Sequence, residues 1–166
     1  MVAKSPRQKA HRVGSQRIIL NTIITMIKDD TIRRIGVLQD YLKKVTFYTE
    51  LPVEDVINNF EKLSTLERQF ILMTDEAFEI NSALAYQLGN KIPESNRSTF
   101  YEIADLGIIT QEFADKISLS AKTRNNLVHN YDKVQKSVSV NNMKIFTDLY
   151  TQYAKILVVK FIDNAQ

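Results

Sequence analysis

A long apolar stripe at helical spacing lies between Ser64 and Gly89 and limits the architectures open to this chain. Successive members are three or four residues apart, so they share one face of a helix that must pack against other elements. Ser64 and Glu67 have the spacing of a capping box at the start of this helix, and Gly89 is a typical residue at its end. The stripe predicts one long core helix, whose inward residues are Leu66, Phe70, Met73, Ala77, Ile80, Leu84 and Leu88.

Apolar positions at the same spacing predict shorter helices on both sides of the stripe. These helices are expected from about residue 30, after Pro52, from Thr99 to Gly107, from Thr110 onward, and from about Val140 to Phe161, with the two threonines as N-caps. The first would bury Ile35, Leu38, Leu42 and Val45, and the last Phe146, Leu149, Tyr153, Ile156 and Val159. With 4 glycines and 3 prolines, the chain has too few turn-forming residues for a many-stranded β fold. We therefore predict an all-α, antiparallel bundle of five or six helices.

The 166 residues are predicted to form a short N-terminal extension, residues 1–29, and one helical domain, residues 30–166. Residues 1–17 carry five basic side chains and no acidic one, which leaves a net −2 for the remainder of a chain whose total is +3. This basic arm is either a disordered tail or a segment that contacts RNA and releases counterions. The apolar stretch of residues 18–27 is too short to span a membrane, and no secretory signal precedes it, so a soluble cytoplasmic protein is expected.

One arginine interrupts the apolar face of the helix that is predicted to begin at Thr110. By spacing, the inward positions of this helix are Phe113, Ile117, Ala121, Arg124, Val128 and Tyr131. Because a guanidinium keeps its charge in a protein, an inward Arg124 must meet an anion, a partner subunit or a water-filled cleft. The alternative is a structural ion pair with a carboxylate of the long helix such as Glu79. Three acidic residues of that helix are interpreted as a solvated face or as partners of arginines: Asp75, Glu76 and Glu79.

The segment that follows Arg124 reads RNNLVHNY up to Tyr131 and contains His129, the only histidine of the predicted domain. Arginine lies five residues before this histidine and tyrosine two residues after it. This R-x4-H-x-Y spacing resembles the motif of the HEPN-domain toxins of the HepT family. The order of the predicted helices over about residues 30–162 is also similar to that family.

The resemblance implies a metal-independent endoribonuclease that acts as the toxin of a type VII-like toxin–antitoxin system. Histidine titrates near neutral pH, so His129 is able to take the proton from a ribose 2′-hydroxyl group. Arg124 would stabilise the negative charge that develops on the attacked phosphate. Asn125, one turn before His129, either orients the histidine or is a solvated helix residue. No cofactor is expected, and no metal, because one histidine cannot form a histidine cluster and cysteine is absent.

The positions of Arg124 and His129 also predict how the protein assembles. A regular helix directs side chains five residues apart about 140° away from each other, so one straight helix does not aim both at one atom. Either the helix breaks near Asn130 and Asp132, or a second protomer completes the cleft, as HEPN domains do by dimerising. A two-fold homodimer is therefore predicted.

The resemblance further implies a protein partner. In the HepT family the motif tyrosine, Tyr131 in this chain, receives AMP from an MntA-like minimal nucleotidyltransferase antitoxin. The added phosphate would occupy the anion site of the substrate beside Arg124. From its position alone, Tyr131 is also consistent with a ring packed on the apolar face and a hydrated hydroxyl group. The alternative function is a non-catalytic HEPN module that binds a nucleotidyltransferase or nucleic acid. The complete motif favours the nuclease, whereas the weakly acidic domain mildly favours the alternative.

Overall fold

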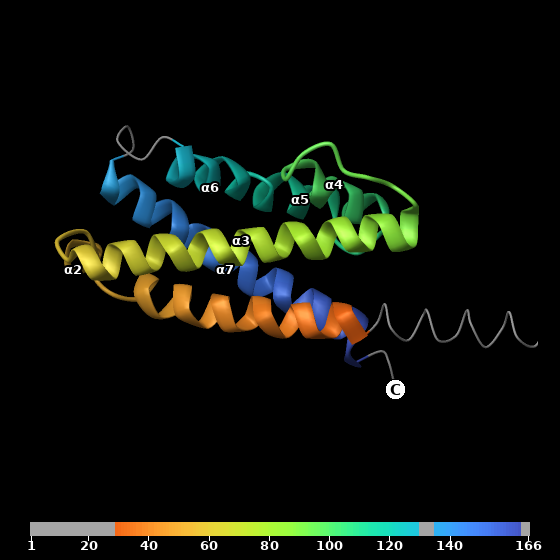
Figure 1. Ribbon diagram of the computed structural model, residues 1–166, viewed down its shortest axis with the longest axis horizontal. Coiled ribbons are helices and arrows are strands. Elements are labelled where there is room, and N and C mark those ends of the chain that lie inside the picture. The colour runs from red at the N-terminus through yellow and green to blue at the C-terminus, as the bar shows by residue number, and fades with distance from the viewer. Residues whose placement is uncertain (1–28, 130–134, 164–166) are drawn as a thin grey trace, which may run out of the picture.

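The computed structural model describes residues 29–129 and 135–163, and these ranges contain helices and no strand (Figure 1). A helical segment covers residues 29–49, here called the first segment. It is followed by α2 (Val53–Ile57), α3 (Phe60–Gly89), α4 (Ser98–Asp105), α5 (Gln111–Ile117), α6 (Ser120–His129) and α7 (Lys136–Phe161). The prediction of an all-helical fold is confirmed. Nearly all of the predicted N-terminal extension lies outside the described residues, as does Tyr131.

Helix α3 lies in the middle of the bundle (Figure 1). The first segment runs along one side of α3, helices α4, α5 and α6 lie along the other side, and α7 crosses α3 obliquely. Helix α6 contacts both α3 and α7, the two longest helices. In the described ranges, no helix combines the length and the apolar character that crossing a membrane requires.

The predicted stripe of α3 forms the centre of the core. Leu88, its last member, is 57 % exposed, whereas the other six are buried: Leu66, Phe70, Met73, Ala77, Ile80 and Leu84. The four residues predicted for the first segment are buried as well. Helix α7 begins at Lys136, four residues earlier than predicted, and Val159 near its end is half exposed rather than inward.

A buried polar group fixes how α3, α4 and α7 sit against one another. The side chain of Asn81 in α3 accepts a hydrogen bond from the Tyr153 hydroxyl at 2.6 Å and donates one to the Thr99 hydroxyl at 3.3 Å. The rings of Phe100, Tyr150 and Tyr153 meet edge to face around this group, with centroids 5.9 to 6.5 Å apart. Since an unpaired buried amide is costly, these two hydrogen bonds favour the observed register of the three helices.

The prediction that Ser64 and Glu67 form a capping box at the start of α3 is wrong. The helix begins at Phe60, and its N-cap is Asn59, whose side-chain oxygen accepts the backbone N–H of Lys62 at 2.9 Å. Ser64 and Glu67 therefore lie inside the helix. Asparagine caps helices as well as serine does, so two competing caps lie close together in this sequence, and the earlier one is used.

The connection between α3 and α4 also differs from the prediction in its details. Asn90 follows α3 in a left-handed conformation, with φ of 52°, which asparagine tolerates better than most residues. Helix α4 begins at Ser98, and Ser95 and Ser98 each accept the other's backbone N–H with their hydroxyl oxygens. Thr99, the predicted cap, is instead a buried residue of the helix. Gly107 follows α4 with φ of +71°, consistent with its predicted role as a stop.

The predicted single helix from Thr110 is two helices. Thr110 does cap α5, because its hydroxyl oxygen accepts the Phe113 backbone N–H at 3.2 Å. The chain then leaves the helical path between Ile117 and Ser120. The hydroxyl groups of Ser118 and Ser120 donate to backbone carbonyls three residues earlier, at 3.2 and 2.6 Å. Such side-chain bonds compete with the helical ladder and end α5 at this point.

Candidate active site

Helix α6 carries three of the four predicted site residues: Arg124, Asn125 and His129. The break before Ser120 shifts the helical phase relative to α5. As a result Leu127, not Val128, faces the core, and Val128 is 43 % exposed. The prediction that Val128 lies on the inward face is therefore wrong. Tyr131 lies outside the described residues, so its predicted role stays a prediction.

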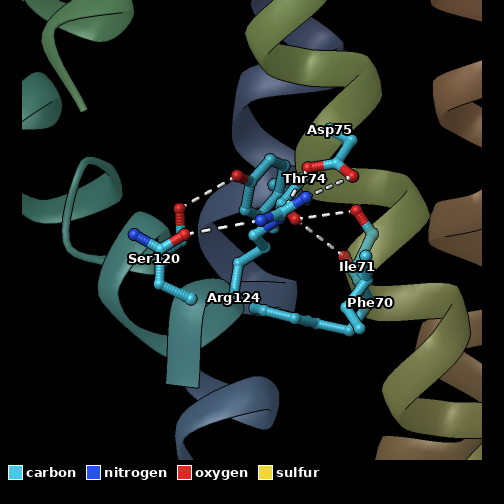
Figure 2. A network of polar contacts seen from close by, with 8 residues as sticks. Phe70, Ile71, Thr74, Asp75, Ser120 and Arg124 are labelled. Carbon is cyan, nitrogen blue, oxygen red and sulfur yellow. Dashed lines mark hydrogen bonds and ion pairs between the residues drawn. The ribbon is translucent and has the colours of Figure 1, made fainter. Parts of the chain in front are cut away.

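Arg124 forms a two-bond ion pair with Asp75 of α3 (Figure 2). Its Nε donates to Oδ1 of Asp75 at 2.8 Å, and its Nη2 donates to Oδ2 at 3.0 Å. The Arg124 side chain is 21 % exposed and that of Asp75 is 37 % exposed. The alternative given for Arg124, an ion pair with a carboxylate of the long helix, is therefore what the structure shows. The carboxylate is that of Asp75 and not that of Glu79, which is exposed one turn further along α3. The phase of α6 after the break decides which carboxylate is in reach.

The ion pair leaves part of the guanidinium available. A guanidinium has five N–H donors, and Asp75 uses one on Nε and one on Nη2. Nη1 faces Asn125, whose side-chain oxygen accepts from it at the long distance of 3.5 Å. Arg124 is able to offer the remaining donors to an oxyanion while Asp75 holds its plane.

His129 is the last residue of α6 and is exposed. A regular helix of this length directs Arg124 and His129 about 140° apart. Helix α6 stays regular up to His129, so it does not aim the two side chains at one point. The predicted break near Asn130 and Asp132 lies outside the described residues.

A buried hydrogen bond anchors the first turn of α6 to α7 (Figure 2). The Ser120 hydroxyl donates to the Ile117 carbonyl, so its oxygen is left to accept the proton of the Tyr150 hydroxyl at 2.9 Å. Both side chains are fully buried, and burial raises the pKa of Tyr150, which keeps the phenol protonated as a donor. Sequence reasoning missed this contact, because neither Ser120 nor Tyr150 belongs to the motif.

A second ion pair joins α3 to the first segment beside the Arg124 pair. Arg34 donates to Glu76 from Nη1 at 3.1 Å and to Asp30 from Nε at 3.0 Å. Asp75 and Glu76 are therefore partners of arginines, as one interpretation of the sequence held, whereas Glu79 is exposed, as the other held. In the described part of the chain, histidine, aspartate and glutamate side chains form no group of three that is able to hold a metal ion.

Residues 38–153 match the model of a family described as ribonuclease HepT-like. A tRNA nuclease HepT of Aphanizomenon flos-aquae is 30 % identical over 115 residues, which are 69 % of this chain and 76 % of that protein. A putative RNase of Archaeoglobus fulgidus is 24 % identical over 128 residues, which are 76 % of this chain and 90 % of that protein.

Solved structures with a similar fold come from toxin–antitoxin complexes. One is a tri-AMPylated Shewanella oneidensis HEPN toxin in complex with its MNT antitoxin, with a TM-score of 0.69 and 18 % identity over 78 % of this chain and 96 % of that one. Another is a toxin–antitoxin with AMP-PNP, with a TM-score of 0.70 and 18 % identity over 79 % of this chain and 98 % of that one. At this identity the likeness establishes the helical architecture.

Proposed function

The chain belongs to the HepT-like ribonuclease family, and we propose that it is a metal-independent endoribonuclease whose site is formed by Arg124 and His129. We assign this activity to a domain of residues 30–166, within which the family match lies. The observation that carries the proposal is the pairing of Arg124 with Asp75. It holds a guanidinium at the surface with free donors, on the same helix as an exposed histidine.

The chemistry follows from what these two side chains do near neutral pH. His129 takes the proton from a ribose 2′-hydroxyl group, whose oxygen then attacks the adjacent phosphorus. The bond from phosphorus to the 5′-oxygen breaks, and that oxygen takes a proton from water as it leaves, while the His129 imidazolium returns its proton to water. Arg124 donates hydrogen bonds to the phosphate oxygens as their negative charge grows. The products are a 2′,3′-cyclic phosphate and a free 5′-hydroxyl group.

The product ends and a chelator test this proposal. We expect the purified protein to cleave RNA at an unchanged rate in excess EDTA, because neither proton transfer nor charge stabilisation uses a metal ion here. The new 5′ ends should accept a labelled phosphate from polynucleotide kinase without prior phosphatase treatment. Cleavage that stops in EDTA, or 5′ ends that already carry phosphate, would contradict the mechanism.

We further propose a homodimer in which a second protomer completes each cleft. The angle between Arg124 and His129 requires a contribution from outside the single helix. Apolar side chains are exposed near this region, among them Val128 of α6 and Val138 of α7. Leu119 and Ile145, at 49 % and 60 % exposure, line a hollow of about 450 Å³ between the α5–α6 junction and α7. A second copy packed on these side chains would cover them and bring its own α6 to the cleft.

For regulation we propose a minimal nucleotidyltransferase partner that adds AMP to Tyr131. One similar solved structure is a tri-AMPylated HEPN toxin in complex with MNT antitoxin, and another is a toxin–antitoxin with AMP-PNP, which supports an antitoxin partner of this kind. Tyr131 follows Arg124 by seven residues in the sequence, a spacing that returns to nearly the same face of a helix. A phosphodiester anion attached there would compete with RNA phosphate for the Arg124 guanidinium. The toxin would then be inactive.

Tyr131→Phe tests the regulatory proposal. With the partner and ATP, wild-type protein should gain about 329 Da for each AMP and lose RNA cleavage, whereas Tyr131→Phe should gain no mass and resist inactivation. Intact-mass spectrometry and a cleavage assay on the same samples measure both effects. Tyr86→Phe is the control for loss of a tyrosine hydroxyl elsewhere in the chain, because Tyr86 is 60 % exposed, and it should leave modification intact. Silencing of Tyr131→Phe without added mass would show that the partner inhibits by binding alone.

A further inference from the structure

We propose that Asp75 is a positioning residue for RNA cleavage, which holds the Arg124 guanidinium in the orientation that phosphate requires. This inference rests on the proposed catalytic role of Arg124. In the pair between Arg124 and Asp75, a single arginine bonds both oxygens of one carboxylate. Two parallel bonds fix the guanidinium plane, whereas a single bond leaves it free to rotate.

The pairing selects which edge of the guanidinium remains open. Asp75 occupies the edge formed by Nε and Nη2, which leaves the two N–H groups of Nη1 and the remaining N–H of Nη2. One of the Nη1 donors makes the long contact of 3.5 Å to Asn125. Figure 2 shows the Arg124 side chain extending from α6 toward α3, where the carboxylate of Asp75 receives it. An unpaired arginine samples many rotamers and must lose that freedom when it binds a phosphate. The carboxylate orders the side chain before RNA arrives.

Both ends of this pair are held by buried structure. Thr74, the residue before Asp75, is fully buried, so this turn of α3 is held in the core. Its hydroxyl is satisfied within the same helix by the carbonyls of Phe70 and Ile71, at 3.1 and 2.9 Å (Figure 2). On the opposite side, the Ser120 hydroxyl group fixes the first turn of α6 through Tyr150. The carboxylate and the arginine therefore come from two anchored helices, as a preorganised site requires.

A positioning role predicts a different kinetic effect from a stabilising or purely electrostatic role. The pair is partly exposed, and exposed ion pairs contribute little to stability. A carboxylate next to a phosphate site repels RNA, so by charge alone its removal would tighten binding. If Asp75 orients Arg124, its removal lowers kcat without raising KM, because the misaligned guanidinium still attracts RNA but stabilises the transition state poorly.

Asp75→Asn is the test variant, because asparagine keeps the shape of the side chain but provides one acceptor oxygen and no charge. Since Asp75 is 37 % exposed, the variant should fold and melt like wild type. We expect kcat for RNA cleavage to fall by about tenfold to a hundredfold, with KM unchanged or lower. Glu76→Gln is the matched control, because Glu76 follows Asp75 on α3 and the substitution weakens a different ion pair, the one to Arg34 of the first segment. Its kcat should stay within about twofold of the wild-type value.

Arg124→Ala, alone and combined with Asp75→Asn, separates this inference from the proposed function. In the Arg124→Ala background, Asp75→Asn should cause no further loss, because Asp75 acts only through the arginine. Full cleavage by Arg124→Ala would overturn the proposed catalytic site itself. An inactive Arg124→Ala together with a wild-type kcat for Asp75→Asn would overturn only the positioning role. Equal losses of kcat in Asp75→Asn and Glu76→Gln would also overturn it, since the effect would then be structural.

Discussion

Replacement of His129 or of Arg124 by alanine is expected to abolish RNA cleavage, with a loss of two or more orders of magnitude in rate for each variant. Without His129, α6 has no imidazole left to take the 2′-hydroxyl proton. Without Arg124 the growing charge on the phosphate loses its donors. The measurement is the initial rate on a labelled RNA, with wild type and both variants at equal concentration.

Both alanine variants should keep the fold, so that the loss of rate reports on chemistry. His129 is exposed at the end of α6. Arg124→Ala leaves Asp75 without its partner, but that carboxylate is exposed enough for water to solvate it. Circular dichroism and thermal melting check this expectation. Arg33→Ala is the control for loss of an arginine, because the Arg33 side chain is 63 % exposed and its partner Asp30 lies three residues earlier in the first segment. Full activity in either site variant would contradict the mechanism.

The second large effect concerns assembly. A substitution that breaks the proposed dimer interface is expected to give an inactive monomer. Wild-type protein should be a dimer at micromolar concentration, and Val128→Asp should dissociate it and remove cleavage together, since a carboxylate would be buried against an apolar surface. Val128 is a suitable position because it is 43 % exposed in the single chain. Leu127 is not a suitable position, because it is 8 % exposed and belongs to the core, so an aspartate there would disturb the fold itself. Sedimentation or solution scattering, paired with the cleavage assay, measures both effects.

A mixing experiment tests whether the two protomers share a cleft. If each cleft takes Arg124 from one protomer and His129 from the other, a heterodimer of the two alanine variants keeps one intact cleft. Random exchange of the two inactive proteins should then restore about a quarter of the wild-type activity. Mixed variants that exchange subunits but stay inactive would contradict a shared cleft, and an active wild-type monomer would contradict the dimer.

The sequence predicts the helix interiors of this protein well and their ends poorly. Burial imposes the helical period, so the stripe from Leu66 to Leu84 identifies the core of α3 directly. The ends depend on competition between nearby caps, and Asn59 precedes Ser64 by only five residues. A period in apolar residues carries no information about that competition.

The candidate site could be predicted in part. The spacing of Arg124 and His129 indicates the family, and the family match confirms that resemblance. An inward arginine also indicates a carboxylate partner, although the sequence suggests Glu79 as readily as Asp75. The choice between them depends on the break before Ser120, where serine hydroxyl groups bond to the backbone. The spacing of apolar residues in the sequence continues across this break and so gives no sign of it. The roles of Asn125 and Tyr131 stay predictions.

The break between α5 and α6 also bears on how independently the motif helix can unfold. Helix α6 has ten residues, and only Ser120, Ala121 and Leu127 of these are buried, whereas α3 has thirty residues and a continuous buried face. An isolated helix of ten residues is marginal in water, so α6 depends on its contacts with α3 and α7. Segments of this kind open locally at lower free energy than the core does. Amide hydrogens of α6 would exchange with solvent before those of α3. On heating, RNA cleavage would be lost at a lower temperature than the helical signal of the rest of the bundle.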